Sequence, residues 1–237
     1  DVTIKTNDGA LLTNFNKQNA IGVEPCLNLA RITRKKGYTT LNKYWELDLA
    51  KKIKKKFNSI DLIYSANTLT HISNLNDVFR SIEKVLSSNG ILIIEDPSLL
   101  ECMKKVSYDQ FYNEHIYVFS AISVQHLLKK FNLEIFDIKN LPTHGGSLRY
   151  YIKKKSNKKI KINDSVKKQI KNEKRFNLDK FNTYIRFAKS AISSKNKLIN
   201  IFSKLKLSEK KIVGYCASAK ATTIINFFYL NGNFIYD

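Results

Sequence analysis

Four consecutive residues near the middle of the chain, Tyr112, Asn113, Glu114 and His115, combine side chains suited to acid–base chemistry. An imidazole titrates near neutral pH and can remove a proton from a substrate. A phenol can donate a hydrogen bond to a developing oxyanion, and a carboxylate can hold the imidazole in one orientation. This segment is therefore a candidate reaction centre. The alternative is structural, because a histidine among aromatic residues is also typical of the start of an amphipathic helix.

A second histidine follows a predicted strand. The segment "SANTLTHI", residues 65–72, places Asn67 and His71 just after the apolar run at 60–65. In open parallel sheets, ligands bind beyond the carboxyl ends of the strands, so both side chains are candidates for a binding or reaction site. His71 could instead cap the next helix.

Two other strand ends carry groups suited to a nucleoside. The turn "KTNDGALL" contains Asn7, Asp8 and Gly9, and offers backbone N–H groups with a glycine for close approach of a ligand. Glu24 ends the next strand, where its two oxygens match the vicinal hydroxyls of a ribose, although it could simply be a surface residue in a turn. Only Gly9 matches a G-x-G-x-x-G pattern, which argues against a dinucleotide.

Three residues further along the chain are candidates for binding a substrate. In "PTHGGSLR", His144 lies beside two glycines and shortly before Arg149, and both could meet a phosphate or a sugar. A hairpin turn would explain these glycines equally well. Lys220 follows small residues at the start of a predicted helix, where backbone amides and a point charge could contact a pyrophosphate.

The strands and helices of the fold must position these groups. In the sequence, short apolar runs alternate with segments of helical periodicity. Such alternation implies crossover connections and a parallel sheet covered by helices on both faces. Helix ends are expected at Lys36–Gly37 and at Ser88–Gly90. We expect strands at 2–4, 21–23, near residue 38, 60–65 and 90–96, and helical segments at 11–18, 26–37, 47–57 and 75–90.

The pattern changes after residue 98. Ser120 is a predicted N-cap of a helix, and two strand-like runs at 133–140 and 147–154 are expected to form an antiparallel hairpin at one side of the sheet. Two helices are expected before residue 208. We therefore divide the chain into an α/β domain at 1–155, a helical linker at 156–208, and the start of a second α/β domain at 209–237.

Composition restricts the remaining classes of function. The formal net charge is +21, but the excess is nearly all lysine, with few aromatic residues beside it, so nucleic acid is an unlikely partner and a solvated surface or a phosphate-bearing substrate is favoured. We see neither a membrane span nor a signal peptide. Cys26, Cys102 and Cys216 form no CxxC pair, which fits a reducing cytoplasm and predicts no structural metal site.

Several segments together resemble a known family. The order "ND-G-x-LL", "GVEPCLNLA", "ANTLTHISNLND" and "GILIIEDPSLL" resembles S-adenosylmethionine-dependent methyltransferases with a seven-stranded, Rossmann-like sheet. The block from Tyr108 to Ile152, which contains "FYNEHIYVFS" and "PTHGGSLRYYI", resembles the C-methyltransferases that act on nucleotide-linked deoxysugars. "GYCASAK" is similar to the turn that opens the C-terminal domain of that family. The resemblance covers the whole chain.

The resemblance implies a cofactor, a substrate and roles for residues. The cofactor would be S-adenosylmethionine and the substrate a nucleotide-diphosphate-linked keto-deoxysugar, methylated on carbon after loss of the proton next to the keto group. His115 matches the histidine favoured as the base. Tyr112, Glu114 and His71 match other active-site residues, and Asn67 matches a neighbouring polar contact.

The chain departs from the resembled family at several places. Lys5 stands where a glycine is usual, and Asn113 replaces a frequent histidine. We expect a piece of a longer protein, without the N-terminal zinc-binding module of the family and without most of its C-terminal domain, and hence no metal in this chain. Two other readings stay open: a methyltransferase acting on RNA or a small molecule, and a basic binding fragment without catalytic activity.

Overall fold

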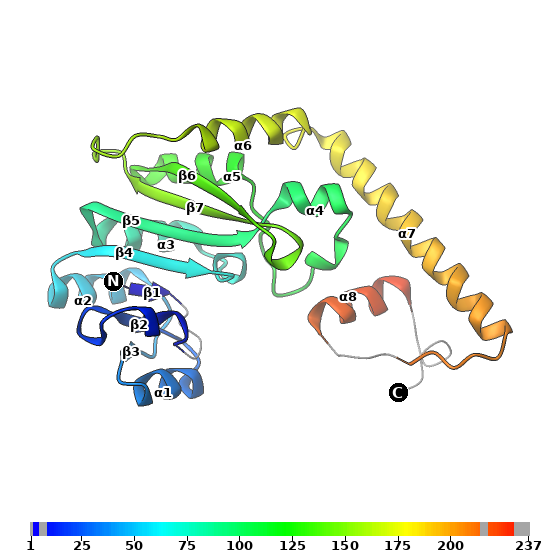
Figure 1. The fold of residues 1–237 in the computed structure, drawn as a ribbon, viewed down its shortest axis with the longest axis horizontal. Helices are drawn as coiled ribbons and strands as arrows, with labels where there is room; N and C mark the ends of the chain where they lie inside the picture. Colours follow the sequence, from blue (N-terminus) through cyan, green and yellow to red (C-terminus); the bar gives the residue numbers. More distant parts are fainter. Residues whose placement is uncertain (1, 5–8, 214–217, 230–237) are drawn as a thin grey trace.

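A computed structural model describes residues 2–4, 9–213 and 218–229 of the chain. Its centre is a seven-stranded sheet of order β3-β2-β1-β4-β5-β7-β6 (Figure 1). The first five strands pair in parallel, and the last two form an antiparallel hairpin whose second strand pairs with β5. The predicted mixed α/β fold is therefore confirmed. The strands are β1 (Val2–Ile4), β2 (Ile21–Val23), β3 (Thr39–Leu41), β4 (Ile60–Ala66), β5 (Leu86–Pro97), β6 (Leu133–Leu141) and β7 (Ser147–Lys154).

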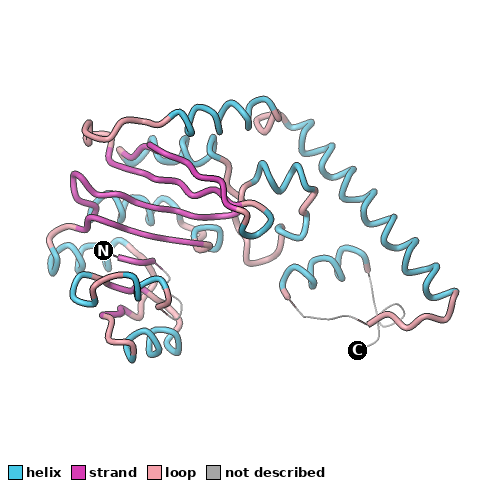
Figure 2. The backbone as a smooth tube through the Cα atoms, in the orientation of Figure 1, coloured by secondary structure: helices cyan, strands magenta, loops and turns pink. Residues whose placement is uncertain are grey.

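Helices connect these strands and pack on the sheet (Figure 2). Apolar side chains of α2, α3 and α5 form one continuous core with the inward-facing residues of β4, β5 and β7, which removes this whole layer from water. The helices are α1 (Leu27–Lys35), α2 (Leu47–Phe57), α3 (Leu75–Val85), α4 (Leu99–Lys105), α5 (Ala121–Leu128), α6 (Asp164–Arg175), α7 (Phe181–Leu207) and α8 (Ala219–Phe228).

The two faces of the central strands are buried to different degrees. Burial alternates with the two-residue period of a strand, as it does where one face meets a core and the other meets solvent. Ile63, Leu92 and Ile152 are 0% exposed. Their neighbours on the other face, which include Leu62, Tyr64, Ile91, Ile93, Arg149 and Tyr151, are half-buried.

The prediction of a helix at 11–18 is wrong. The structure has two short 3-10 turns there, Leu11–Asn14 and Lys17–Asn19. The Asn14 side chain donates to the Leu11 carbonyl, and the Asn16 side chain accepts the Gln18 N–H. Such local bonds compete with the α-helical ladder, and asparagine therefore favours turns and caps over helix interiors.

The prediction of a helix end at Ser88–Gly90 is also wrong. The helix α3 stops at Val85, and Leu86 already has extended backbone at the start of β5. Gly90 is needed for a close approach of strands, because a Cβ there would lie 2.9 Å from the Ile60 carbonyl oxygen. The same residue type marks helix ends and crowded strand positions, and its neighbours in sequence do not distinguish the two.

The linker region folds back on the sheet domain. The predicted pair of helices is confirmed as α6 and α7, and Ser120 is the predicted N-cap of α5, in a capping box with Ser123. The buried Glu173 of α6 accepts the Ala121 and Ile122 N–H groups at 2.8 and 2.9 Å. A carboxylate from α6 thus completes the N-terminus of α5.

The helices α7 and α8 bring the end of the described chain back towards the middle of the sequence (Figure 1). The ring of Tyr108, in the 3-10 turn Tyr108–Gln110, lies 5.4 Å from the ring of Phe227 and 6.2 Å from that of Phe228. Its hydroxyl is 3.4 Å from Ser194 Oγ on α7. The C-terminal end of α8 therefore packs against the 3-10 turn that precedes the His115 segment. Within the described part of the chain, no helix has the length and apolar character to cross a membrane.

Candidate active site

His115 lies at the centre of a hydrogen-bonded cluster between α4 and α5. Its Nδ1 is 2.9 Å from the Gln110 carbonyl oxygen, and its Nε2 is 2.7 Å from the Tyr112 hydroxyl. A carbonyl oxygen can only accept, so Nδ1 must carry the proton. In the neutral ring, Nε2 therefore has the free lone pair and accepts the Tyr112 O–H. This is the tautomer that a base acting through Nε2 requires.

The surroundings keep this imidazole neutral. Burial lowers the pKa of His115, while its bond to the Gln110 carbonyl acts in the opposite direction. The positive charge of Lys220 also lowers this pKa, which places the start of α8 within electrostatic reach of the ring. Burial likewise raises the pKa of Tyr112, with a further contribution from the Glu114 carboxylate. Near neutral pH the pair is therefore a neutral base beside a protonated phenol.

Backbone contacts join this cluster to the loop after β4. The Ile116 and Tyr117 N–H groups both donate to the Thr70 carbonyl, at 2.9 and 3.2 Å. His71 Nδ1 is 2.9 Å from the Glu114 carbonyl oxygen, so His71 donates there. The rings of His71 and His115 meet edge to face, with their centroids 5.0 Å apart. The structure thus brings together the two histidines that the sequence singled out.

Glu114 does not hold the imidazole as its position in the sequence suggested. Its side chain is exposed, and the Gln110 carbonyl occupies the Nδ1 position that the carboxylate was expected to fill. What Glu114 provides is its own backbone carbonyl, for His71. The reason is geometric, since Glu114 lies in a turn closed by the His115 N–H and the Tyr112 carbonyl, and its side chain projects into solvent.

The predicted cofactor residues lie at the carboxyl ends of β2 and β4. These strands flank β1 on its two sides, so their ends are roughly 10 Å apart. Glu24 is 0% exposed, and its Oε1 accepts the Cys26 N–H at 2.9 Å. Asn67 has a left-handed φ of 49°, and its N–H donates to the Glu95 carbonyl. Lys5, Asn7 and Asp8 lie outside the described residues.

Two observations test whether this end of the sheet fits a nucleoside. Gly9 has a φ of +77°, and a Cβ there would lie 2.8 Å from Thr33 Cγ2, so only glycine lets the turn lie against α1. Asn67 Oδ1 is buried and has no hydrogen-bond partner among the described residues. A ligand that donates there would satisfy it. The chemistry fits, although the complete burial of Glu24 means that a ribose could reach it only after a local opening.

The three predicted substrate residues have different surroundings. Arg149 donates through Nε and Nη2 to Glu95 Oε2, at 3.0 and 2.7 Å, so much of its guanidinium is already engaged. The His144 side chain is exposed in the β6–β7 turn, while its carbonyl accepts from Gln110 Nε2 at 2.9 Å. Lys220 is half-buried near His115. The structure thus brings His144 and Lys220, but not Arg149, into contact with the His115 cluster or into its electrostatic reach.

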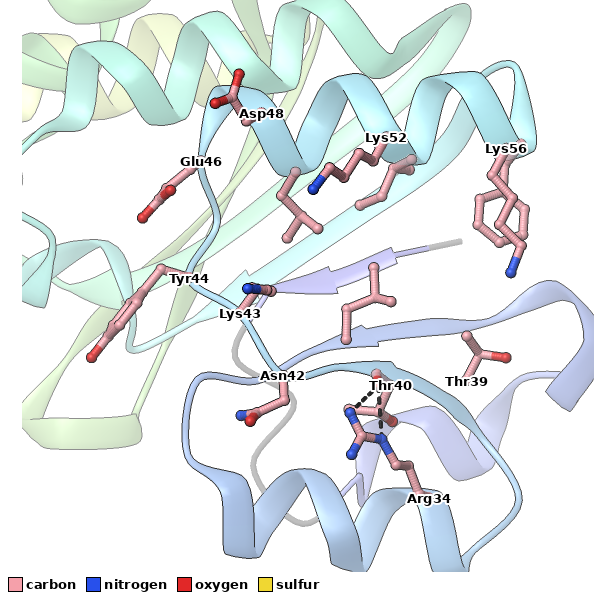
Figure 3. A pocket seen from close by; sticks show the side chains of 14 residues that line it. Arg34, Thr39, Thr40, Asn42, Lys43, Tyr44, Glu46, Asp48, Lys52 and Lys56 are labelled. Carbon is pink, nitrogen blue, oxygen red and sulfur yellow. Dashed lines mark hydrogen bonds between the residues drawn. The ribbon is translucent and has the colours of Figure 1, made fainter.

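A groove of about 490 Å³ lies between β3 and α2, and its lining includes none of the predicted site residues. Leu41, Leu49, Ile53 and Phe57 form its apolar part, and the side chains of Lys52 and Lys56 lie along α2 (Figure 3). One end reaches Asn42, whose side chain donates to the Glu24 carbonyl at 2.9 Å. The groove is therefore a neighbour of the cofactor end and separate from the His115 cluster.

Sequence reasoning missed Gln110 and Asn42. The backbone carbonyl of Gln110 accepts from the His115 ring. The side chain of Asn42 donates to the backbone carbonyls of Glu24 and Pro25. A backbone contact has no signature in residue type, so the sequence carries no signal for it. Among the described residues, no three His, Cys, Asp or Glu side chains gather in a way that could hold a metal ion.

Two family models match the chain. Residues 6–138 match a family model described as a methyltransferase domain, and residues 142–236 match one described as a C-methyltransferase C-terminal domain. C-methyltransferase NovU of Streptomyces niveus is 27% identical over 149 residues, which cover 62% of this chain and 36% of the relative. The chain thus spans about a third of the length of that curated relative.

Solved structures give a weaker similarity. A SAM-dependent methyltransferase from Anabaena variabilis aligns with a TM-score of 0.48 and 17% identity, over 65% of this chain and 76% of that one. A possible histamine N-methyltransferase from Thermotoga maritima aligns with a TM-score of 0.46 and 18% identity, over 63% and 79% of the two chains.

Proposed function

The chain belongs to the methyltransferase-domain family, and from this we propose that it forms part of an S-adenosylmethionine-dependent C-methyltransferase acting on a nucleotide-diphosphate-linked keto-deoxysugar. The observation that supports carbon as the acceptor is the state of His115. It is neutral, it carries its proton on Nδ1, and its basic Nε2 is paired with a phenol. Methylation of the carbon next to a keto group depends on removal of a proton from that carbon, and a neutral imidazole with a basic Nε2 can remove it.

In this proposal His115 takes the proton from the carbon next to the keto group. The electron pair left behind moves onto the keto oxygen as an enolate, which a donated hydrogen bond stabilises. Because Tyr112 occupies the lone pair of Nε2 in this structure, its hydroxyl must either rotate away or relay the proton when a substrate binds. The same hydroxyl could donate to the enolate oxygen once it has left Nε2.

The cofactor-binding residues are proposed at the ends of β1, β2 and β4. Gly9 lets the first turn lie close to α1, Glu24 would accept the ribose hydroxyls, and Asn67 Oδ1 would accept a donor from the nucleoside. Asn7 and Asp8 are proposed as further contacts of the cofactor. S-adenosylmethionine would supply an electrophilic methyl group on a sulfonium. Asn67 and His71 belong to the same loop after β4, which brings the cofactor end next to the base.

The substrate side is proposed to include His144 and Lys220. Lys220 follows the N-cap Ser218 of α8 and lies near His115, where its ammonium could meet a pyrophosphate oxygen. Arg149 would contribute through donors that Glu95 does not use.

Calorimetry followed by product analysis tests the proposal. S-adenosylhomocysteine should bind the wild-type chain, and Glu24→Gln should weaken binding by about tenfold, or about 1.4 kcal/mol, while the exposed Glu46→Gln should not. With 13C-methyl S-adenosylmethionine and a nucleotide-linked keto-deoxysugar, the label should appear on carbon. A label on oxygen or nitrogen would indicate another acceptor chemistry. Salt-sensitive RNA binding without S-adenosylhomocysteine binding would indicate a basic binding module and would contradict the proposal.

A further inference from the structure

Gln110 is the buried residue that connects the candidate base to the β6–β7 turn. It is 4% exposed and ends the 3-10 turn that precedes the His115 segment. Its carbonyl oxygen accepts from His115 Nδ1, and its side-chain Nε2 donates to the His144 carbonyl. One residue therefore bonds to the imidazole through its backbone and to the turn through its side chain.

The side-chain bond fixes the orientation of the Gln110 amide. The His144 carbonyl can only accept, so the amide must present its NH2 group there, and the reversed amide would place two oxygens together. Gln110 Oε1 is then buried without a partner among the described residues. An unsatisfied buried oxygen costs free energy, and the bond to the turn must offset that cost for the amide to keep this position.

The turn to which Gln110 is attached is itself rigid. His144 has a left-handed φ of 53°, and the Gly146 N–H donates to the Thr143 carbonyl. The Gly146 carbonyl accepts from the Ser98 N–H, at the start of α4. A Cβ at Gly146 would lie 2.7 Å from Glu101 Cβ, so the turn packs directly on α4. A bond to this turn is therefore an anchor on a fixed part of the fold.

We propose that Gln110 is a positioning residue. Its carbonyl holds His115 in the Nδ1–H tautomer, and its side chain anchors that carbonyl on the β6–β7 turn. This inference rests on the proposed function, since it takes His115 as the base. It adds that the basic lone pair is directed to Nε2 by a residue that bonds to the other ring nitrogen. The same bond fixes the turn that presents His144.

The tautomer can be read directly by NMR of the full chain labelled with 15N-histidine. The sequence has only four histidines, and His115→Asn identifies the resonances of His115 by their loss. Long-range 1H–15N correlation near pH 7 distinguishes a protonated Nδ1 from a protonated Nε2. The wild type should contain the Nδ1–H form of His115 in about tenfold excess or more, since only that form bonds to the Gln110 carbonyl.

The variant Gln110→Met keeps length and volume but removes the donor to the turn. It should reduce the excess of the Nδ1–H form at least about threefold, because the carbonyl is no longer anchored. Gln169→Met is the matched control. Gln169 is also a buried glutamine, 5% exposed, and it donates to Glu173 in another part of the fold. Its substitution should leave the His115 tautomer unchanged.

Two results would overturn the inference. One is a wild-type His115 that is protonated mainly on Nε2, which decides the matter even if Gln110→Met fails to fold. The other is a folded Gln110→Met protein with the wild-type tautomer ratio. The measurement needs no cofactor or substrate. A protein with the expected tautomer but without methyl transfer would therefore count against the proposed function alone.

Discussion

At the scale of single residues, the candidate cofactor end depends on a glycine, Gly9, that lies too close to α1 for a larger residue. Gly9 has a left-handed φ of +77°. A Cβ added at Gly9 would also lie 2.8 Å from the side chain of Thr33 in α1. Gly145 has a similar φ of +81°, but a Cβ there would meet nothing within 4 Å. A substitution at Gly145 therefore tests backbone strain alone, whereas the same substitution at Gly9 tests backbone strain together with a steric clash.

Gly9→Ala should destabilise the protein more than Gly145→Ala does. Both substitutions add the cost of a left-handed alanine, about 1–2 kcal/mol, and only the first adds a clash with Thr33. We expect a total loss of roughly 2–3 kcal/mol for Gly9→Ala, measured by urea unfolding. Equal losses in the two variants would show that the first turn does not lie tightly against α1.

The groups of the candidate site were partly predictable at this scale. Tyr112, His115 and His71 could be found from the sequence because their chemistry lies in their side chains, and the structure places them together. The role expected for Glu114 was wrong, and Gln110 was missed, because both points depend on which backbone carbonyl faces an imidazole nitrogen. Every residue carries a carbonyl, so its direction follows only from the path of the chain.

At the scale of helices and strands, one buried carboxylate joins the linker to the sheet domain. Glu173 accepts two N–H groups at the start of α5 and a third hydrogen bond from Gln169 Nε2, at 3.0 Å. It is 0% exposed, so water cannot replace a lost partner. The position of α6 against α5 is therefore sensitive to this single side chain.

Glu173→Gln should destabilise the folded state by about 2–4 kcal/mol. The glutamine side chain has only one oxygen, so it can accept fewer of the three hydrogen bonds that the carboxylate accepts. Its NH2 group would also face the backbone N–H groups of α5, which are donors themselves. Asp164→Asn, an exposed acid in the first turn of α6, serves as the control and should change stability by about 0.5 kcal/mol or less. Thermal and urea unfolding measure both. A loss in Glu173→Gln no larger than in the control would contradict this account of the α5–α6 contact.

The secondary structure was predictable where residue types agree with periodicity. Runs of β-branched and apolar residues located β4, β5 and the β6–β7 hairpin, and Ser120 identified the start of α5. The prediction failed at 11–18, where asparagine side chains bond to the local backbone, and at 86–90, where the strand begins directly after α3. The interactions at 11–18 are local, whereas Gly90 is required by the approach of Ile60, which is distant in sequence.

At the scale of the whole molecule, a residue far along the chain influences the candidate base His115. Rings of Tyr108, Phe227 and Phe228 hold α8 near the His115 segment, and the charge of Lys220 then contributes to lowering the pKa of His115. The sequence predicted α8 but could not place it, because an apolar helix face does not specify its partner. The long helix α7 makes this return possible.

Lys220→Gln should therefore raise the pKa of His115. Burial remains the main cause of the lowered value, so the pKa should move towards its ordinary range and stay below it. A base is inactive when protonated, so the acidic limb of the rate profile should move to higher pH in this variant. An NMR titration of His115 measures the shift without substrate. Lys197→Gln, at an exposed position on α7, is the control and should leave the titration unchanged.

A His115 titration that is unchanged, or that moves to lower pH, in Lys220→Gln would show that α8 is not close to the base. This outcome would separate the position of α8 from the chemistry of His115. The hydrogen bonds of His115 to Gln110 and Tyr112 involve no residue of α8 and would not be affected.

The most direct test of the account is hydrogen exchange at the carbon that loses the proton. A nucleotide-linked keto-deoxysugar is incubated in D2O with the wild-type chain and with His115→Asn, and proton NMR follows deuterium entering the position next to the keto group. The account predicts that the wild type accelerates exchange on the order of 10²–10⁴-fold over the variant, the usual contribution of a positioned general base. Equal exchange rates in the two proteins would contradict the assignment of His115 as the base.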